Sequence, residues 1–92
     1  MIGSFEHRGL KRLYEFGDAR GIRPDVLDRV EDILSRLDNV ETAQAMNLPG
    51  YRLHRLKGKL KGFWSVAVNA NWRVFFRFED EDAFDVDLID YH

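Results

Sequence analysis

The stretch GFWSVAVNANWRVFFRF, residues 62–78, contains two runs in which apolar and other side chains alternate. Alternation with a period of two is typical of strands that bury one face. The short Asn69-Ala70-Asn71 link between the runs is typical of a tight turn. The stretch therefore predicts an antiparallel hairpin. Its core-facing residues are Trp64, Val66, Val68, Trp72, Val74, Phe76 and Phe78, and its outer residues are Phe63, Ser65, Ala67, Asn69, Arg73, Phe75 and Arg77.

The segments on either side of this hairpin continue the pattern. Downstream, EDED at 79–82 predicts a second turn, and AFDVDLIDY at 83–91 alternates again. Upstream, YRLHRL at 51–56 predicts a further strand, so the strands form an antiparallel meander. In the last strand, the expected core residues are Phe84, Val86 and Leu88, and the expected outer residues are Asp85, Asp87 and Ile89.

Two helices are predicted before the sheet. In FEHRGLKRLYEFG, residues 5–17, apolar side chains recur at helical spacing, and Gly17 or Gly21 should end the helix. The segment RPDVLDRVEDILSRLDN, residues 23–39, carries a longer stripe, with Pro24 expected in its first turn. Residues 39–50 are expected to form a connector with room for a helical turn. The stripe residues are Leu10, Leu13 and Tyr14 in the first helix, and Val26, Val30, Ile33, Leu34 and Leu37 in the second.

The predicted fold class is α+β, with the two N-terminal helices packed on one face of a small curved antiparallel sheet. A chain of 92 residues without internal repeats is expected to form one domain, 1–92. The N-terminus lacks the apolar region of a secretory signal, and no apolar run is long enough to span a membrane. A cytoplasmic protein without membrane contact is therefore expected.

Charge is strongly segregated along the chain, although the net charge is only -2. Residues 42–78 contain seven Lys/Arg and no acid, whereas residues 79–92 contain seven acids and no Lys/Arg. Such a basic stretch can attract phosphates locally, because salt screening confines the field to about 10 Å. A solvated basic face is the simpler interpretation of the same pattern.

The types and the spacing of the reactive side chains exclude several kinds of site. The chain has no cysteine, and His7, His54 and His92 are too scattered for a metal site, so no metal or cofactor is predicted. No serine lies in a nucleophile elbow, and the glycines form no phosphate-binding loop. A basic, aromatic surface with two imidazoles remains, and it suits metal-free RNA cleavage. In that reaction a 2'-hydroxyl attacks the adjacent phosphate, a base removes its proton, and cations stabilise the phosphorane.

Four segments carry a family resemblance: MIGSFEHRGLKRLYEFG at 1–17, HRLKG at 54–58, the stretch at 62–78 and the terminal DYH at 90–92. Together they resemble the HigB branch of the RelE/ParE toxin superfamily. The resemblance implies a RelE/ParE-like, microbial ribonuclease-like fold and a ribosome-dependent mRNA endonuclease acting in the 30S A site. It also implies inhibition by a HigA-type helix-turn-helix antitoxin, with operator DNA contacted only through the antitoxin complex.

The resemblance also implies the site residues. The H-x-L-K-G motif gives His54 and Lys57, the N-W-R motif gives Arg73, and the terminus gives Asp90, Tyr91 and His92. The histidines are expected to share proton transfer in an unassigned order, and Lys57 and Arg73 to stabilise the phosphorane. Asp90 should support His92, and Tyr91 should position the substrate. General RNA contacts are expected from Arg52, Arg55, Lys59 and Lys61, and base stacking from Phe63 and Phe75.

Several alternatives remain open from the sequence. Related toxins on the same fold inhibit DNA gyrase without cutting RNA, and an inactive module could only bind its antitoxin. Arg73 could be paired with Asp85 or Asp87 across the sheet instead of contacting phosphate. Strict alternation also places Lys57 on the face opposite His54, and Asp90 with the core residues. A common site therefore requires a turn or bulge at both places.

Overall fold

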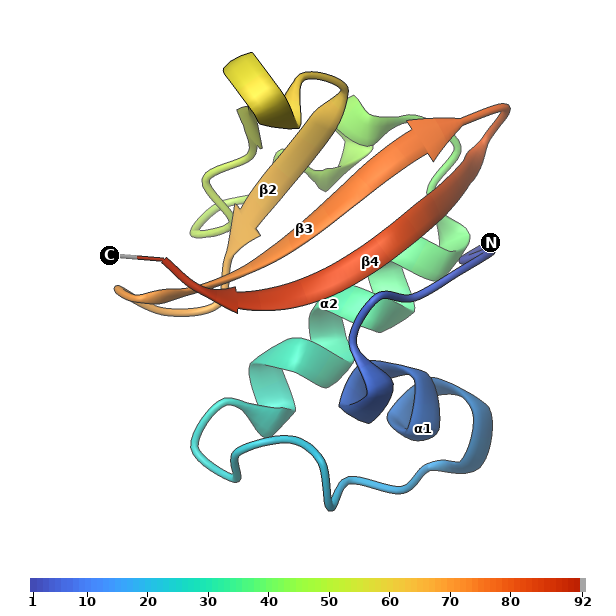
Figure 1. Cartoon of the computed structure of the whole chain (residues 1–92), viewed down its shortest axis with the longest axis vertical. Coiled ribbons are helices and arrows are strands. Elements are labelled where there is room, and N and C mark those ends of the chain that lie inside the picture. Colours follow the sequence, from blue (N-terminus) through green and yellow to red (C-terminus); the bar gives the residue numbers. More distant parts are fainter. Residues whose placement is uncertain (92) are drawn as a thin grey trace.

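The computed structural model describes residues 1–91, and His92 lies outside the described residues. Both α-helices lie on one side of a four-stranded antiparallel sheet with the strand order β1-β2-β3-β4 (Figure 1). This confirms the predicted α+β fold class. The elements are α1 (Arg8–Phe16), α2 (Leu27–Asn39), the 3-10 turn η1 (Ala43–Met46), β1 (His54–Arg55), the 3-10 turn η2 (Gly58–Leu60), β2 (Phe63–Ala67), β3 (Trp72–Glu79) and β4 (Asp82–Asp90).

The hairpin predicted from residues 62–78 is formed by β2 and β3. The Asn69 side chain accepts hydrogen bonds from the backbone N–H groups of Asn71 and Trp72 at 2.9 and 2.8 Å, which closes the turn. Val66 and Val74 pair across the strands and are fully buried beneath the sheet. The predicted core face is therefore confirmed, and Trp64 and Trp72 pack against this core.

The last strand departs from strict alternation. Asp85 has a φ of 53°, and the β3–β4 register shifts between Phe75 and Arg77, which identifies a β-bulge. Because the bulge adds a residue to β4, Ala83 takes the buried position, while Phe84 lies under the Arg77 guanidinium on the outer face. The prediction that Phe84 faces the core was wrong for this reason.

The N-terminal segment covers the free edge of β4, which the sequence pattern did not predict. Gly3 N–H donates to the Ala83 carbonyl at 2.7 Å, and Val86 N–H donates to the Ser4 carbonyl at 3.1 Å. The Met1 ammonium group lies 3.0 Å from Asp82. An edge strand with unpaired backbone groups would invite pairing with another chain, so this segment protects the sheet.

The helices begin and end for local reasons. His7 Nδ1 accepts the Leu10 N–H at 3.1 Å at the start of α1. Gly17, one of the two glycines predicted to end that helix, does so with a φ of 68°. By contrast, Pro24 precedes α2, which begins only at Leu27, so its predicted place in the first helical turn was wrong. The buried stripe of α2 consists of Val30, Ile33, Leu34 and Leu37.

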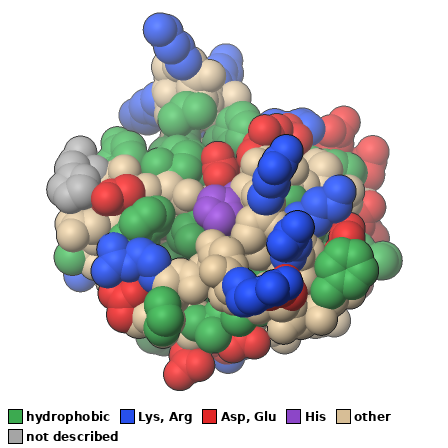
Figure 2. All heavy atoms as spheres, turned by 60° about the horizontal axis from the view of Figure 1, so that its bottom comes forward, with side chains coloured by type: hydrophobic (Ala, Val, Ile, Leu, Met, Phe, Trp, Pro, Cys, Tyr) green, Lys and Arg blue, Asp and Glu red, His purple; other side chains and the backbone are tan. Residues whose placement is uncertain are grey.

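The outer surface of the helical layer carries interspersed positive and negative side chains (Figure 2). Asp18, which follows α1, pairs with Arg20 at 2.9 Å and with Arg12 at 3.9 Å. Such exposed pairs each contribute little to stability. Among residues 1–91, no helix combines the length and the apolar character needed to cross a membrane.

The strand predicted at 51–56 is shorter than expected. Only His54 and Arg55 form β1, because Arg52 has a φ of 51° and turns the chain before the strand. Tyr51 instead points into the core, where its hydroxyl donates to the Asp32 carboxylate of α2. Burial and this hydrogen bond together raise the pKa of Tyr51.

A second tyrosine predicts a measurable dependence of stability on pH. Tyr14 donates to Asp38 at 2.6 Å, and this hydrogen bond raises the pKa of Tyr14 from 10.0 to about 12. The stabilisation is therefore fully present below pH 10 and is lost as pH rises through 12. We expect Tyr14→Phe to cost about 1 kcal/mol at neutral pH. The difference between the two proteins in urea unfolding should shrink between pH 10 and 12; a constant difference would contradict this assignment.

Candidate functional site

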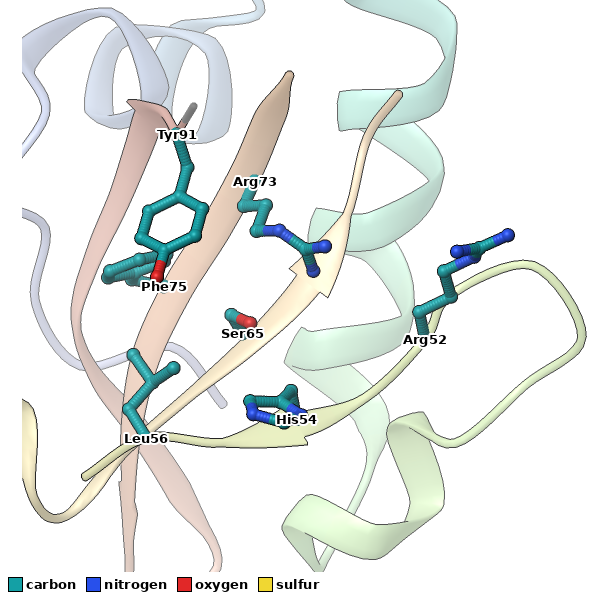
Figure 3. Close-up of a pocket in the computed structure, with 7 residues that line it drawn as sticks. All are labelled: Arg52, His54, Leu56, Ser65, Arg73, Phe75 and Tyr91. Atoms are coloured by element: carbon teal, nitrogen blue, oxygen red, sulfur yellow. The ribbon is translucent and has the colours of Figure 1, made fainter. Parts of the chain in front are cut away.

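A cavity of about 310 Å³ opens on the outer face of the sheet, opposite the helices. Figure 3 shows the His54 imidazole and the Arg73 guanidinium on either side of Ser65, with the Tyr91 ring beside Phe75. The lining side chains come from β1, β2, β3 and the segments that flank β1 and follow β4. They are Arg52, His54, Leu56, Ser65, Arg73, Phe75 and Tyr91.

Strand register explains why residues distant in sequence meet here. His54 pairs with Ser65 across β1 and β2, and Ser65 pairs with Phe75 across β2 and β3. Paired residues point to the same face of a sheet, so these three side chains form one row. On the same face of the sheet, the next pair toward the turn is Ala67 and Arg73, which places the guanidinium beside that row.

Tyr91 is held just beyond the end of β4. Its N–H donates to the Asn71 carbonyl at 2.6 Å, and its ring packs against Phe75 with 6.0 Å between ring centroids. The Arg73 guanidinium lies 5.9 Å from the centre of the Tyr91 ring. Tyr91 is 52% exposed, whereas Phe75 is 3% exposed. Tyr91 is therefore the aromatic side chain that a ligand can reach, and Phe75 forms the floor.

The cavity is electropositive. Arg52 and Arg73 line it, and none of the lining residues in the described chain is Asp or Glu. Arg77, four residues after Arg73 on the same face of β3, is instead bound by Asp85 at 2.7 Å and by Glu79 at 3.4 Å. Asp85, one of the two carboxylates considered as a partner for Arg73, thus binds Arg77.

Three of the six residues expected at the catalytic centre, His54, Arg73 and Tyr91, line this cavity. Lys57 lies outside it, at the start of η2, where it lines a separate hollow of about 290 Å³ with Arg55 and Lys61. Leu56 borders both hollows. Asp90 is exposed at the end of β4, paired with Trp72, and is not among the residues that line the cavity. The expected role of His92 falls outside the described residues.

The residues expected to make general RNA contacts are divided between these surfaces. Arg52 forms part of the cavity wall, while Arg55, Lys59 and Lys61 are exposed on β1 and around η2. Phe63 is half-buried at the far end of β2. Sequence reasoning did not assign Ser65 and Leu56 to the site. Alternation had placed Ser65 on the correct face, but only the β1–β2 register brings it next to His54.

Comparison with known proteins agrees with this architecture. Residues 3–92 match the family model described as the RelE-like toxin of the type II toxin-antitoxin system HigB. The chain is 42% identical to Endoribonuclease HigB from Proteus vulgaris over 92 residues, which cover 100% of both chains. It is 29% identical to Toxin HigB-1 from Vibrio cholerae over 84 residues, which cover 87% of this chain and 86% of that one.

Solved structures of other proteins share the fold at low sequence identity. A chain of the YoeB-YefM toxin-antitoxin complex from Staphylococcus aureus aligns with a TM-score of 0.63 at 15% identity, covering 100% of this chain and 98% of that one. YafQ from E. coli aligns with a TM-score of 0.54 at 14% identity, covering 95% and 89%. These two similarities concern the fold alone, whereas the family model and the Proteus vulgaris relative define the family. The chain belongs to the HigB-like toxins, which are RelE-like toxins of type II toxin-antitoxin systems.

Proposed function

We propose that this toxin is a metal-independent endoribonuclease that cleaves mRNA in the 30S A site of the ribosome. The observation that carries the proposal is the cavity that is lined by a histidine, an arginine and an exposed tyrosine. A relative of 42% identity is named an endoribonuclease, which supports the same reaction class. The basic surface around η2, next to the cavity, would favour a polyanionic substrate.

The proposed reaction begins with attack of an RNA 2'-hydroxyl on the adjacent phosphorus. The 2'-hydroxyl loses its proton to a base, the P–O5' bond breaks, and the leaving 5'-oxygen receives a proton from an acid. The products are a 2',3'-cyclic phosphate, or the 3'-phosphate formed when water opens it, and a free 5'-hydroxyl. No step requires a metal ion, because side chains supply the protons and the positive charge.

The residues lining the cavity are assigned roles in this scheme. Arg73 would stabilise the negative charge that develops on the phosphorane, because the guanidinium can donate two parallel hydrogen bonds to phosphate oxygens. His54 would share proton transfer with His92, and Tyr91 would position the substrate by stacking on a base. Lys57 and Asp90 keep their predicted roles, phosphate stabilisation and support of His92. For Lys57 to reach phosphate, the substrate would have to extend beyond the cavity or the chain would have to move.

A type II toxin has an antitoxin partner, and we propose an antitoxin of the HigA type with a helix-turn-helix domain. Operator DNA would be contacted only through the antitoxin complex. A ribosomal substrate also implies that the toxin acts in the cytoplasm.

The proposal predicts new transcript ends in living cells. Wild type and His92→Ala, induced at matched soluble levels, should differ in newly formed 5' ends mapped across translated transcripts. We expect in-frame cuts with wild type, and their loss both in the variant and when translation is blocked. Growth arrest without such cuts would instead favour a protein target such as gyrase, and equal cutting by the variant would remove His92 from the mechanism.

A further inference from the structure

We propose that Arg29 of α2 is a positioning residue for the candidate site. It would anchor the segment that precedes Arg52 and the end of β2 that pairs with Arg73, so that the two guanidinium groups share one wall of the cavity. This inference rests on the proposed function and extends it to a residue on the opposite side of the sheet. None of the motifs that indicated the site includes Arg29.

The contacts of Arg29 join two backbone segments that are separate in sequence. Its Nη2 donates to the Gly50 carbonyl at 2.9 Å, and Nη2 and Nε donate to the Ala67 carbonyl at 3.3 and 3.4 Å. The guanidinium also lies 4.2 Å from the centre of the Tyr51 ring. The planar fork of arginine can make all these contacts at once, whereas the compact ammonium group of lysine cannot.

One of these anchors lies next to Arg52, which has an uncommon backbone conformation. Its φ of 51° lies in the left-handed region, and Gly50 has a φ of 84°. A side-chain-bearing residue in that region costs about 1 kcal/mol or more and persists only where its surroundings enforce it. Here both residues that precede Arg52 are fixed by hydrogen bonds through their carbonyl groups. Arg29 binds the Gly50 carbonyl, and the Tyr51 carbonyl accepts the Ala67 N–H at 2.6 Å.

The other anchor lies opposite Arg73. Ala67 is the cross-strand partner of Arg73 in the β2–β3 register, so the Arg29 hydrogen bonds fix the end of β2 at that pair. A further hollow of about 520 Å³ continues from the candidate site along this wall. Both anchored residues, Gly50 and Ala67, line it together with Arg52 and Arg73. The hydrogen bonds of the half-buried Arg29 thus set the relative position of Arg52 and Arg73, the two arginines expected to bind phosphate.

A double-mutant cycle on cleavage of mRNA bound to purified ribosomes tests this role. We expect Arg29→Ala to lower the cleavage rate by about 10- to 100-fold, because misplacing positioned groups by about 1 Å can cost about 100-fold. In an Arg52→Ala background the same change should cost clearly less, since it acts partly through Arg52. Arg36→Ala, on the same helix and with a surface ion pair, is the matched control and should cleave like wild type. Independent, multiplying effects of Arg29→Ala and Arg52→Ala would overturn the proposal, as would an Arg29→Ala rate equal to that of the control.

Backbone amide spectra of the free protein provide a readout that does not depend on cleavage. Arg29→Ala should shift the amide resonances of Arg52, Ala67 and Arg73 more than Arg36→Ala does, while the α1 resonances stay in place. Unshifted resonances would overturn the positioning role. If wild type cuts no RNA, the proposed function fails, and these shifts still decide whether Arg29 anchors the two segments. Should Arg29→Ala not fold, Arg29→Lys, which keeps the charge and loses the fork, takes its place in both measurements.

Discussion

Arg73→Ala is expected to lower the rate of RNA cleavage by about 100- to 1,000-fold, the usual effect of removing one group that stabilises transition-state charge. Arg73 is the guanidinium that lies beside the row formed by His54, Ser65 and Phe75. The measurement is the single-turnover rate on mRNA bound to ribosomes. Arg73→Lys keeps the charge without the planar fork, and we expect it to recover only part of the loss.

The position of Arg77 provides a matched control for this prediction. Both arginines lie on the outer face of β3, but Arg77 already binds Asp85 and Glu79, and hydrogen bonding to Asp85 raises its pKa. A guanidinium group that already binds two carboxylates has fewer N–H donors and less positive charge available to bind a phosphate. Arg77→Ala should therefore keep a near wild-type cleavage rate, provided that its folded fraction is checked by circular dichroism. Equal losses in the two variants would show that general charge on β3, and not the placement of Arg73, governs the reaction.

The parts of the fold that the sequence predicted are those governed by local periodicity. The alternation in 62–78 fits a strand and the stripe in α2 fits a helix, because only these conformations place the apolar side chains of each segment on one buried face. The parts that it missed depend on contacts between distant segments. The bulge at Asp85 is stabilised by Arg77 and by the Ser4 hydroxyl, which accepts the Asp85 N–H at 2.9 Å. The sequence of β4 alone does not predict that Arg77 and Ser4 bind Asp85.

The residues of the candidate site likewise include some that the sequence predicted and some that depend on contacts between distant segments. The motif resemblance predicted His54, Arg73 and Tyr91 as site residues, and the structure brings all three to one cavity. The resemblance could not predict that Arg52 lines the wall of the cavity. The position of Arg52 follows from its left-handed backbone conformation and from the hydrogen bond between Arg29 of α2 and the Gly50 carbonyl. The place of Ser65 beside His54 follows from the pairing of β1 with β2. Alternation in the sequence predicted a strand longer than the two residues that form β1, so this pairing could not be predicted.

Gly9→Ala is expected to destabilise the protein by about 2 kcal/mol, although local reasoning predicts the opposite. Within a helix, alanine is favoured over glycine by about 1 kcal/mol. Yet a Cβ at Gly9 would lie 2.6 Å from the Gly21 carbonyl oxygen and 2.9 Å from its carbon, and both are backbone atoms. Overpacking of this kind costs about 1–3 kcal/mol, and the rigid partner places this site at the upper end. Subtracting the propensity gain of about 1 kcal/mol leaves a net loss of about 2 kcal/mol.

The size of the effect follows from how little the contact can relax. Gly21 lies in the loop between α1 and α2, and a Cβ there would in turn lie 2.7 Å from the Gly9 Cα, so the two backbones touch directly. Moving that loop would also disturb buried Ile22 and Val26, which belong to the core. For a chain of this size, about 2 kcal/mol corresponds to a fall in Tm of about 8–16 °C. Lys11→Ala, an exposed change in the same helix, should stay within about 0.5 kcal/mol of wild type. A Gly9→Ala variant that melts at or above the wild-type temperature would mean that helix propensity outweighs the contact and that the loop can yield.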